Sequence, residues 1–450
     1  MRLYPDSKVY VVCPGNYHTG GAELLHQLCS QLITFGVDAY MFYFVKGSFD
    51  LKGDPVDDFY RKYHLPYALK PEDAERNIFV AYEGPTEYLY LPKKSQRVLW
   101  WLSADNFLLS LSDYLRSKTL STRLDFTPLQ KFFTFHDQDK EMIHFAQSEY
   151  AYQFLKVNGV PDYKIYMVED YLNQAFLSRA AQVDLSRKQN IVAFNPRKGF
   201  EVTQQLIKFA PDLAWFPIQN MTPEQVQELL AAAKVYIDFG NHPGKDRIPR
   251  EAAISGCVVI TGRRGSAGND VDINIPAEFK FDERNFNPQA VIEKIREVFA
   301  DFDAAHEKQA DYHARILDDK NRFAREVAEA FGIKNAVGGL AILRAVNMES
   351  YYFARAVIQG GEFTPRFIVD DRAASVKKLV GEFLLREQNR NYLCVDENRI
   401  EIITREDAKF LYLEGRIKKF ALAEPTANEF AELQNFFAPK VEDILIFNRK

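Results

Sequence analysis

Short apolar runs rich in β-branched and aromatic residues alternate with helix-compatible segments along the first 180 residues. The first run, at 9–13, ends at a Pro-Gly pair, and a helical pattern starts near residue 22. Strands are also predicted at 39–44, 78–82, 98–102 and 131–135. Such alternation is typical of a parallel sheet covered by helices, so it predicts an α/β domain.

The same alternation restarts after a polar stretch at 178–189, which we interpret as an interdomain link. Strands are predicted at 191–194, 214–218, 235–239 and 257–261, and helices at 202–209 and 223–233, the second with Thr222 as its N-cap. Beyond a helix-rich stretch at 288–331, strands at 367–370 and 392–395 and a helix at 374–387 indicate a further module. We therefore predict two Rossmann-like domains, 1–180 and 181–335, facing a cleft, and an accessory α/β module over 336–450.

Composition narrows the classes of function. A net charge of -5 provides no broad positive field for DNA or RNA, so nucleic-acid binding is disfavoured. The four cysteines form no C-x-x-C pair, which argues against a zinc knuckle and a disulfide framework. Neither a signal-peptide pattern nor an apolar run of roughly 20 residues occurs, so we expect a cytoplasmic protein. The aromatic content of 14% leaves room for association with a membrane surface.

The loop after the first predicted strand contains Gly20 and Gly21. Adjacent glycines let the backbone approach a ligand, and the N–H groups of the following helix start can hold phosphate oxygens. Gly15 and Gly20 are spaced as in a P-loop, but Gly21-Ala22 replaces the Lys-Ser/Thr pair, so a nucleoside triphosphatase is disfavoured. The alternative interpretation is a tight turn before a helix.

Basic residues follow two strands of the second domain. Arg197 and Lys198 precede Gly199 and can neutralise a diphosphate leaving group; the alternative is a solvated surface pair. Further along, Lys245 and Arg247 are candidates to bind phosphate.

The helix expected to start near Pro249 carries Glu251 in its first turn. There the carboxylate gains from the helix dipole and can accept hydrogen bonds from vicinal ribose hydroxyls. The alternative is a capping glutamate on a charged loop. After the next strand, Arg263 lies among glycines in a candidate anion cradle. Asp270-Val271-Asp272 spells D-x-D, but we interpret these acids as solvated and predict no metal site.

Three of these segments together resemble the GT-B glycosyltransferases, and within them the glycosyltransferase family 4-like group of bacterial cell-surface sugar transferases. Gly20-Gly21-Ala22-Glu23 resembles the family's G-G-x-E segment, and Arg197-Lys198-Gly199 its diphosphate-binding element. The run from Glu251 to Val259 resembles E-A-x-A-x-G-x-P-V-V, whose glutamate holds the nucleotide ribose. The resemblance covers about residues 8–335.

The resemblance implies a glycosyltransferase that moves a sugar from a nucleoside-diphosphate sugar to a glycan or lipid-linked acceptor. It implies cell-surface polysaccharide synthesis, metal independence, retention of anomeric configuration and no cofactor besides the nucleotide-sugar co-substrate. On the first domain, Asp105 and His136 are candidates for proton transfer. Candidates for acceptor binding are Tyr82, Glu83, Trp101, which could stack on a sugar ring, and Asn106.

The sequence departs from the family at one position. A second glutamate, usually eight positions before the ribose-binding one, is Pro243 here, and Asp246 and His242 are the nearby candidates to replace it. Two alternatives therefore stay open: a sugar-nucleotide epimerase, and a catalytically inactive GT-B-like binding or scaffold subunit that recruits a partner through the C-terminal module.

Overall fold

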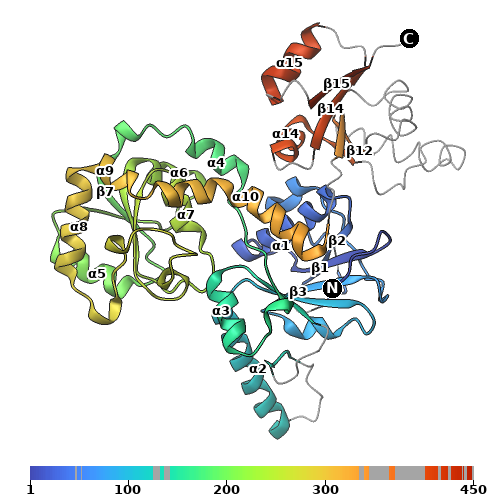
Figure 1. Ribbon diagram of the computed structural model, residues 1–450, viewed down its shortest axis with the longest axis horizontal. Coiled ribbons are helices and arrows are strands. Elements are labelled where there is room, and N and C mark those ends of the chain that lie inside the picture. Colours follow the sequence, from blue (N-terminus) through green and yellow to red (C-terminus); the bar gives the residue numbers. More distant parts are fainter. Residues whose placement is uncertain are drawn as a thin grey trace, which may run out of the picture. The chain divides into compact units, whose positions relative to one another are not determined.

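The computed structural model describes residues 1–45, 48–51, 53–124, 132–135, 142–333, 339–343, 364–369, 401–413, 417–423, 427–437, 439 and 443–447 (Figure 1). These residues contain three sheets. By internal contacts the chain divides into a larger unit, Met1–Arg2 with Asp73–Gly332, and a smaller unit, Leu3–Glu72 with Ile333–Lys450. We call residues 1–180 the first lobe and residues 181–335 the second lobe.

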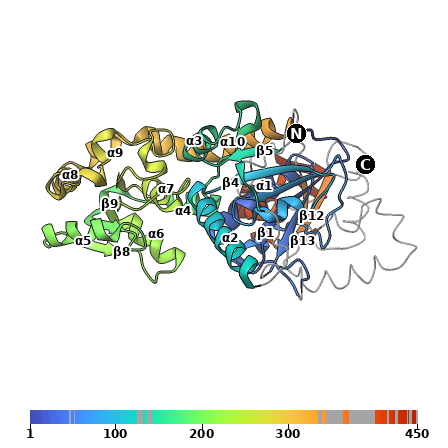
Figure 2. The same cartoon turned by 90° about the horizontal axis from the view of Figure 1, so that it is seen from below.

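The sheet of the first lobe has six strands in the order β2-β1-β3-β4-β5-β6. Its strands are β1 (Lys8–Pro14), β2 (Asp38–Phe44), β3 (Ile78–Tyr82), β4 (Gln96–Trp101), β5 (Ile143–Ala146) and β6 (Ile165–Met167). Its helices are α1 (Gly20–Thr34), α2 (Ala104–Leu124), α3 (Glu149–Val157) and α4 (Gln174–Ala180), with 3-10 turns η1 (Asp58–Tyr63), η2 (Thr86–Tyr90) and η4 (Asp162–Lys164). Strands β1 and β2 pair in parallel, and α1 packs on both. Figure 2 shows α1 next to β1.

Part of the first-lobe prediction is wrong. Residues 132–135 form no strand; Phe132 and Phe133 are instead buried in an aromatic cluster, which an apolar run alone cannot distinguish from a strand. Strands β5 and β6 were not predicted, because they are only four and three residues long. The buried His144 also interrupts the apolar pattern of β5.

The sheet of the second lobe has the order β10-β9-β7-β8, and its strand pairs are parallel. Its strands are β7 (Gln189–Phe194), β8 (Ala214–Pro217), β9 (Ala233–Asp238) and β10 (Val258–Thr261). Its helices are α5 (Phe200–Phe209), α6 (Pro223–Ala232), α7 (Arg247–Ile254), α8 (Pro288–Ala300), α9 (Phe302–Glu307) and α10 (Ala310–Phe331), with 3-10 turns η5 (Leu185–Arg187), η6 (Ser266–Gly268), η7 (Ala277–Phe279) and η8 (Glu283–Asn285).

Two helices of the second lobe test the predicted helix starts. Thr222 and Gln225 form the capping box that opens α6, which confirms the predicted N-cap. Helix α7 begins at Arg247, two residues before the predicted start at Pro249. Glu251 therefore lies in the second turn of α7, away from the helix start where the dipole would favour it most.

The C-terminal module has a parallel sheet of order β13-β12-β11-β14-β15. Its elements are β11 (Gly339–Leu343), β12 (Thr364–Val369), β13 (Glu401–Ile403), α14 (Arg405–Leu413), β14 (Ile417–Ala423), α15 (Ala427–Phe437) and β15 (Ile444–Phe447). The three sheets confirm the predicted α/β class. The predicted helix at 374–387 and strand at 392–395 lie outside the described residues. No helix in the described part of the chain is both long and apolar enough to cross a bilayer.

Candidate active site

Strands β7, β9 and β10 are neighbours in a parallel sheet, so the loops after them lie at the same edge. Glycines allow these loops to pack closely. A methyl group on Gly199, which has φ of +60°, would overlap the Phe239 carbonyl, and one on Gly240 would overlap the Lys198 side chain. The glycines thus bring loops 195–199 and 239–246 together.

The cations of this edge differ in their partners. Arg197 is exposed, and its guanidinium makes no hydrogen bond or ion pair within the described residues. The ammonium of Lys198 pairs with the Asp246 carboxylate at 2.6 Å while 34% of its side chain stays exposed. Arg263 is half-buried, and its backbone N–H donates to Glu283. Arg197 and Lys198 therefore present positive charge to a ligand.

The core of loop 239–246 contains His242 and Asp246, the two residues that the sequence offered in place of the missing glutamate. The His242 ring is fully buried, with Nδ1 3.1 Å from Asp246 Oδ2 and Nε2 3.5 Å from Asp238 Oδ1. Burial disfavours the imidazolium, but Asp246 and Asp238 outweigh burial and raise the His242 pKa. The Asp246 pKa is lowered, because His242 and Lys198 oppose the effect of its burial.

Arg247 and Glu251 interact with one another: Arg247 Nε lies 3.4 Å from Glu251 Oε1. The Glu251 side chain is 15% exposed. This places the predicted ribose-binding carboxylate near the sheet edge but beside a cation of its own helix. The predicted phosphate contact of Arg247 and the ribose contact of Glu251 stay predictions.

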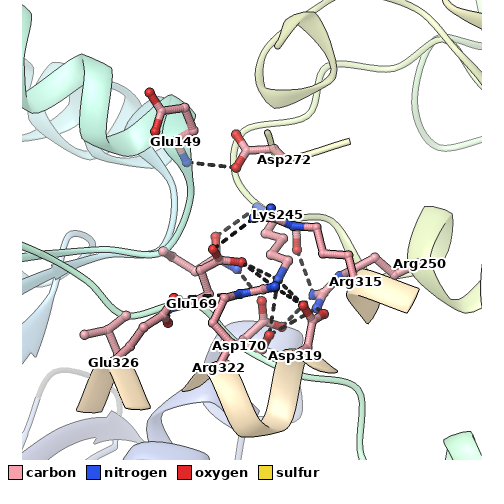
Figure 3. Close-up of polar contacts among 12 residues, drawn as sticks. Glu149, Glu169, Asp170, Lys245, Arg250, Asp272, Arg315, Asp319, Arg322 and Glu326 are labelled. Atoms are coloured by element: carbon pink, nitrogen blue, oxygen red, sulfur yellow. Dashed lines mark hydrogen bonds and ion pairs between the residues drawn. The ribbon is translucent and has the colours of Figure 1, made fainter. Parts of the chain in front are cut away.

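Lys245 lies in a buried ion-pair network, which Figure 3 shows in close-up. Its Nζ is 2.5 Å from Glu169 and 2.9 Å from Asp319, and its side chain is 4% exposed. Arg250, equally buried, pairs with Asp170 at 2.6 Å and with Asp319 at 3.2 Å. Two buried carboxylates thus already neutralise Lys245, which argues against its predicted contact with a donor phosphate.

The network joins the two lobes within the larger unit. Glu169 and Asp170 follow β6 of the first lobe, Lys245 and Arg250 belong to the second lobe, and Asp319 lies on α10. Lys245, Arg322 and Arg315 overcome the burial of Glu169 and lower its pKa to about 2. These contacts attach loop 239–246, through Lys245, to the segment after β6 and to α10.

Asp105, the predicted proton acceptor, contacts the same loop. One carboxylate oxygen accepts from Asn241 Nδ2 at 2.6 Å and the other from Tyr150 Oη at 2.9 Å. Burial and the bond to Asp105 raise the Tyr150 pKa to about 12, so this phenol stays a donor. The neighbouring Asn106 is exposed, and its backbone N–H donates to Ser103. The structure therefore brings Asp105 to the loop that carries His242.

The other first-lobe candidates lie deeper. Trp101 is fully buried, its ring packs on Phe107 and Phe135, and it has no exposed face on which a sugar could stack. Glu83 is buried at the end of β3 next to half-buried Tyr82, and it accepts from the Leu102 N–H at 2.9 Å. Burial raises the pKa of Glu83 to about 8. His136 lies outside the described residues.

The two acids of the D-x-D segment bind different groups. Asp270 pairs with Lys280 at 2.9 Å, whereas Asp272 accepts from the backbone N–H groups of Glu149 and Tyr150 at 2.8 and 3.0 Å. Ser148 is the N-cap of α3, and Asp272 of the second lobe supplies acceptors for two further N–H groups in the first turn of this helix (Figure 3). The described residues contain no group of three or more metal-ligating side chains.

Gly20 and Gly21 lie in the smaller unit, at the first two positions of α1. Thr19 caps this helix by accepting from the Ala22 N–H, and the Tyr60 hydroxyl donates to the Thr19 carbonyl at 2.7 Å. Glu23 is buried and accepts from Tyr63. The two glycines therefore form the start of a capped helix, which agrees with the alternative interpretation, and their predicted contact with donor phosphates stays a prediction.

No family model matches this chain, and no curated protein matches it significantly. Solved structures resemble it only distantly. Anabaena HepE in complex with UDP-glucose is 12% identical with a TM-score of 0.44, over 72% of this chain and 98% of that one. Sucrose-phosphate synthase from Thermosynechococcus elongatus is 13% identical with a TM-score of 0.46, over 72% and 98%. Staphylococcus aureus TarM is 11% identical with a TM-score of 0.38, and the match spans 56% of this chain and 56% of TarM. At these scores the similarities support no functional conclusion.

Proposed function

We propose that this chain is a GT-B-type glycosyltransferase that moves a sugar from a nucleoside-diphosphate sugar to a glycan or lipid-linked acceptor. The observation that carries the proposal is the sheet edge where Arg197 has no ion-pair partner within the described residues and Lys198 is one-third exposed. Two cations at the carboxyl ends of parallel strands are suited to a diphosphate, whose charge grows as it leaves the sugar.

In this proposal Arg197 and Lys198 stabilise the leaving diphosphate, and Glu251 holds the ribose hydroxyls. Asp105 lies beside loop 239–246, where it can accept the proton of the attacking hydroxyl. The reaction proceeds without a metal and retains the anomeric configuration, and its product contributes to cell-surface polysaccharide. The separate partners of Asp270 and Asp272 favour metal independence, because neither carboxylate is oriented toward a shared ion.

Isothermal titration with a panel of nucleoside-diphosphate sugars tests the proposal. We expect one donor to bind, and Arg197→Ala to weaken it about tenfold, because a charge-assisted contact to phosphate is lost. Lys208→Ala, an exposed lysine near the far end of α5, is the matched control and should bind as the wild type does. A folded protein that binds no member of the panel would contradict the proposal and favour the scaffold alternative.

A product assay separates the transferase from the epimerase. The transferase requires an acceptor for turnover of the bound donor. Conversion of the nucleotide-sugar in the absence of any acceptor would instead identify an epimerase.

A further inference from the structure

Four charged side chains form a row from the interior of the second lobe to the sheet edge, and their exposure to solvent increases along it. Asp238, at the end of β9, has a side chain only 2% exposed, and His242 is fully buried. Asp246 is 19% exposed and Lys198 is 34% exposed. Charges alternate along this row of four residues, so a change at the buried end alters the charge balance at the exposed end.

Asp238 is the fixed end of the row. Its carboxylate accepts from the Tyr236 hydroxyl at 2.9 Å and from the Gly240 N–H at 2.9 Å. The His242 ring contacts Asp238 and Asp246 at ion-pair distance without hydrogen-bond geometry. A fully buried ring held between two carboxylates is better explained by its charge than by packing, because an apolar side chain would leave both acids less compensated.

Asp246 is shared between two cations. Its Oδ2 lies 3.1 Å from His242 Nδ1 and 2.6 Å from Lys198 Nζ. A carboxylate that interacts with both groups attracts each less strongly than one that faces a single partner. The charge on His242 therefore decides how tightly Asp246 holds the Lys198 ammonium.

We propose that His242 is a positioning residue that, by partly neutralising Asp246, keeps the Lys198 ammonium available for the diphosphate of the donor. This inference rests on the proposed function and deepens it. It assigns a role to the segment in which Pro243 stands where the resembling family has a glutamate. His242 acts through Asp246 and Lys198 and touches no reacting atom itself.

The inference predicts a pH dependence. The charged groups that face His242 are Asp238 from β9, Asp246 from its own loop and Lys198 from the turn after β7. The two acids outweigh both burial and Lys198, so the His242 pKa lies above its ordinary value of 6.5. At higher pH the ring becomes neutral, Asp246 pairs with Lys198 alone, and the Lys198 charge is less available to phosphate.

The test measures pyrophosphate affinity by isothermal titration from pH 6 to pH 9 in the full-length wild type and in His242→Asn. The ratio of the two dissociation constants cancels the titration of pyrophosphate itself. We expect His242→Asn to bind about fivefold more weakly at pH 6, with the ratio falling below about 2 at pH 9. His306→Asn, a half-buried histidine on α9, is the matched control and should leave the ratio near 1 throughout.

A second substitution keeps the test independent of folding. In a Lys198→Ala background the His242→Asn substitution should change pyrophosphate affinity less than about 1.5-fold, because its effect passes through Lys198. Two results would overturn the inference and leave the proposed function intact, provided that the wild type binds pyrophosphate. One is a ratio of dissociation constants for His242→Asn and wild type that stays constant with pH. The other is a weakening by His242→Asn that persists in the Lys198→Ala background. A wild type that binds neither pyrophosphate nor any nucleoside-diphosphate sugar overturns both.

Discussion

Two groups of cations belong to the same lobe and have opposite surroundings. Arg197 is exposed and Lys198 is partly exposed in the turn after β7, and the Asp246 carboxylate pairs with Lys198. Lys245 and Arg250, from the loop after β9 and the following helix, are buried among Glu169, Asp170 and Asp319. A lysine near a strand end is therefore not by itself a phosphate site. Its counter-charges and burial decide whether it binds a ligand or joins two parts of the fold.

The largest effect on stability should follow from a substitution in the buried ion-pair network. Lys245→Met removes the cation that faces Glu169 and Asp319, which leaves two buried carboxylates less compensated. We expect a loss of about 3–5 kcal/mol in the free energy of unfolding, measured by urea denaturation. Lys198→Met, at the exposed group, should cost less than about 1 kcal/mol. Equal losses for the two variants would contradict the distinction between the groups.

The next effect contrasts two buried acids. Glu169, surrounded by cations, has a pKa of about 2, whereas Glu83, which accepts only backbone hydrogen bonds, has one of about 8 because burial dominates. A raised folded-state pKa contributes stability that is fully present below the ordinary value of 4.5 and is lost as pH rises through about 8. Glu83→Gln does not titrate. We therefore expect its stability relative to the wild type to increase by about 2–4 kcal/mol between pH 5 and pH 9.

Denaturation of both proteins across this pH range measures that difference, with Glu75→Gln, an exposed glutamate, as the control. If the difference in the free energy of unfolding between Glu83→Gln and the wild type does not change with pH, the Glu83 carboxyl is ionised across this whole pH range. It would then need a compensating group that the described contacts do not include.

The smallest effect separates the two acids of the D-x-D segment. Asp272→Ala removes the acceptor for two N–H groups in the first turn of α3, a contact that joins the lobes, and we expect it to destabilise the protein by about 1 kcal/mol. Asp270 is largely exposed beside Lys280, so Asp270→Ala should lower the free energy of unfolding by less than about 0.5 kcal/mol. Thermal denaturation with and without a chelator measures both. Equal effects that vanish on chelation would indicate a shared metal ion instead.

The sequence predicted the fold better than the site. Strands β9 and β10 were recognisable because buried parallel strands are continuous apolar runs, and Thr222 marked a helix start. The short strand β5 and the aromatic run at 132–135 were misread, because hydrophobicity in such short segments does not specify conformation.

The site was harder because its charges pair across long distances in the sequence. Lys245 meets Glu169 and Asp319, 76 and 74 residues away, so no local pattern could show that its charge is compensated. His242 lies among acids at positions 238 and 246, a spacing of four on either side that was visible in the sequence. Burial, which turns that spacing into an interaction, was not visible.

A crystal structure with a bound nucleoside diphosphate tests the central claim most directly. We predict that the diphosphate oxygens lie within hydrogen-bond distance of Lys198 Nζ and the Arg197 guanidinium, while Lys245 keeps its contacts with Glu169 and Asp319. A diphosphate bound to Lys245, or bound away from the ends of β7 and β9, would contradict the account.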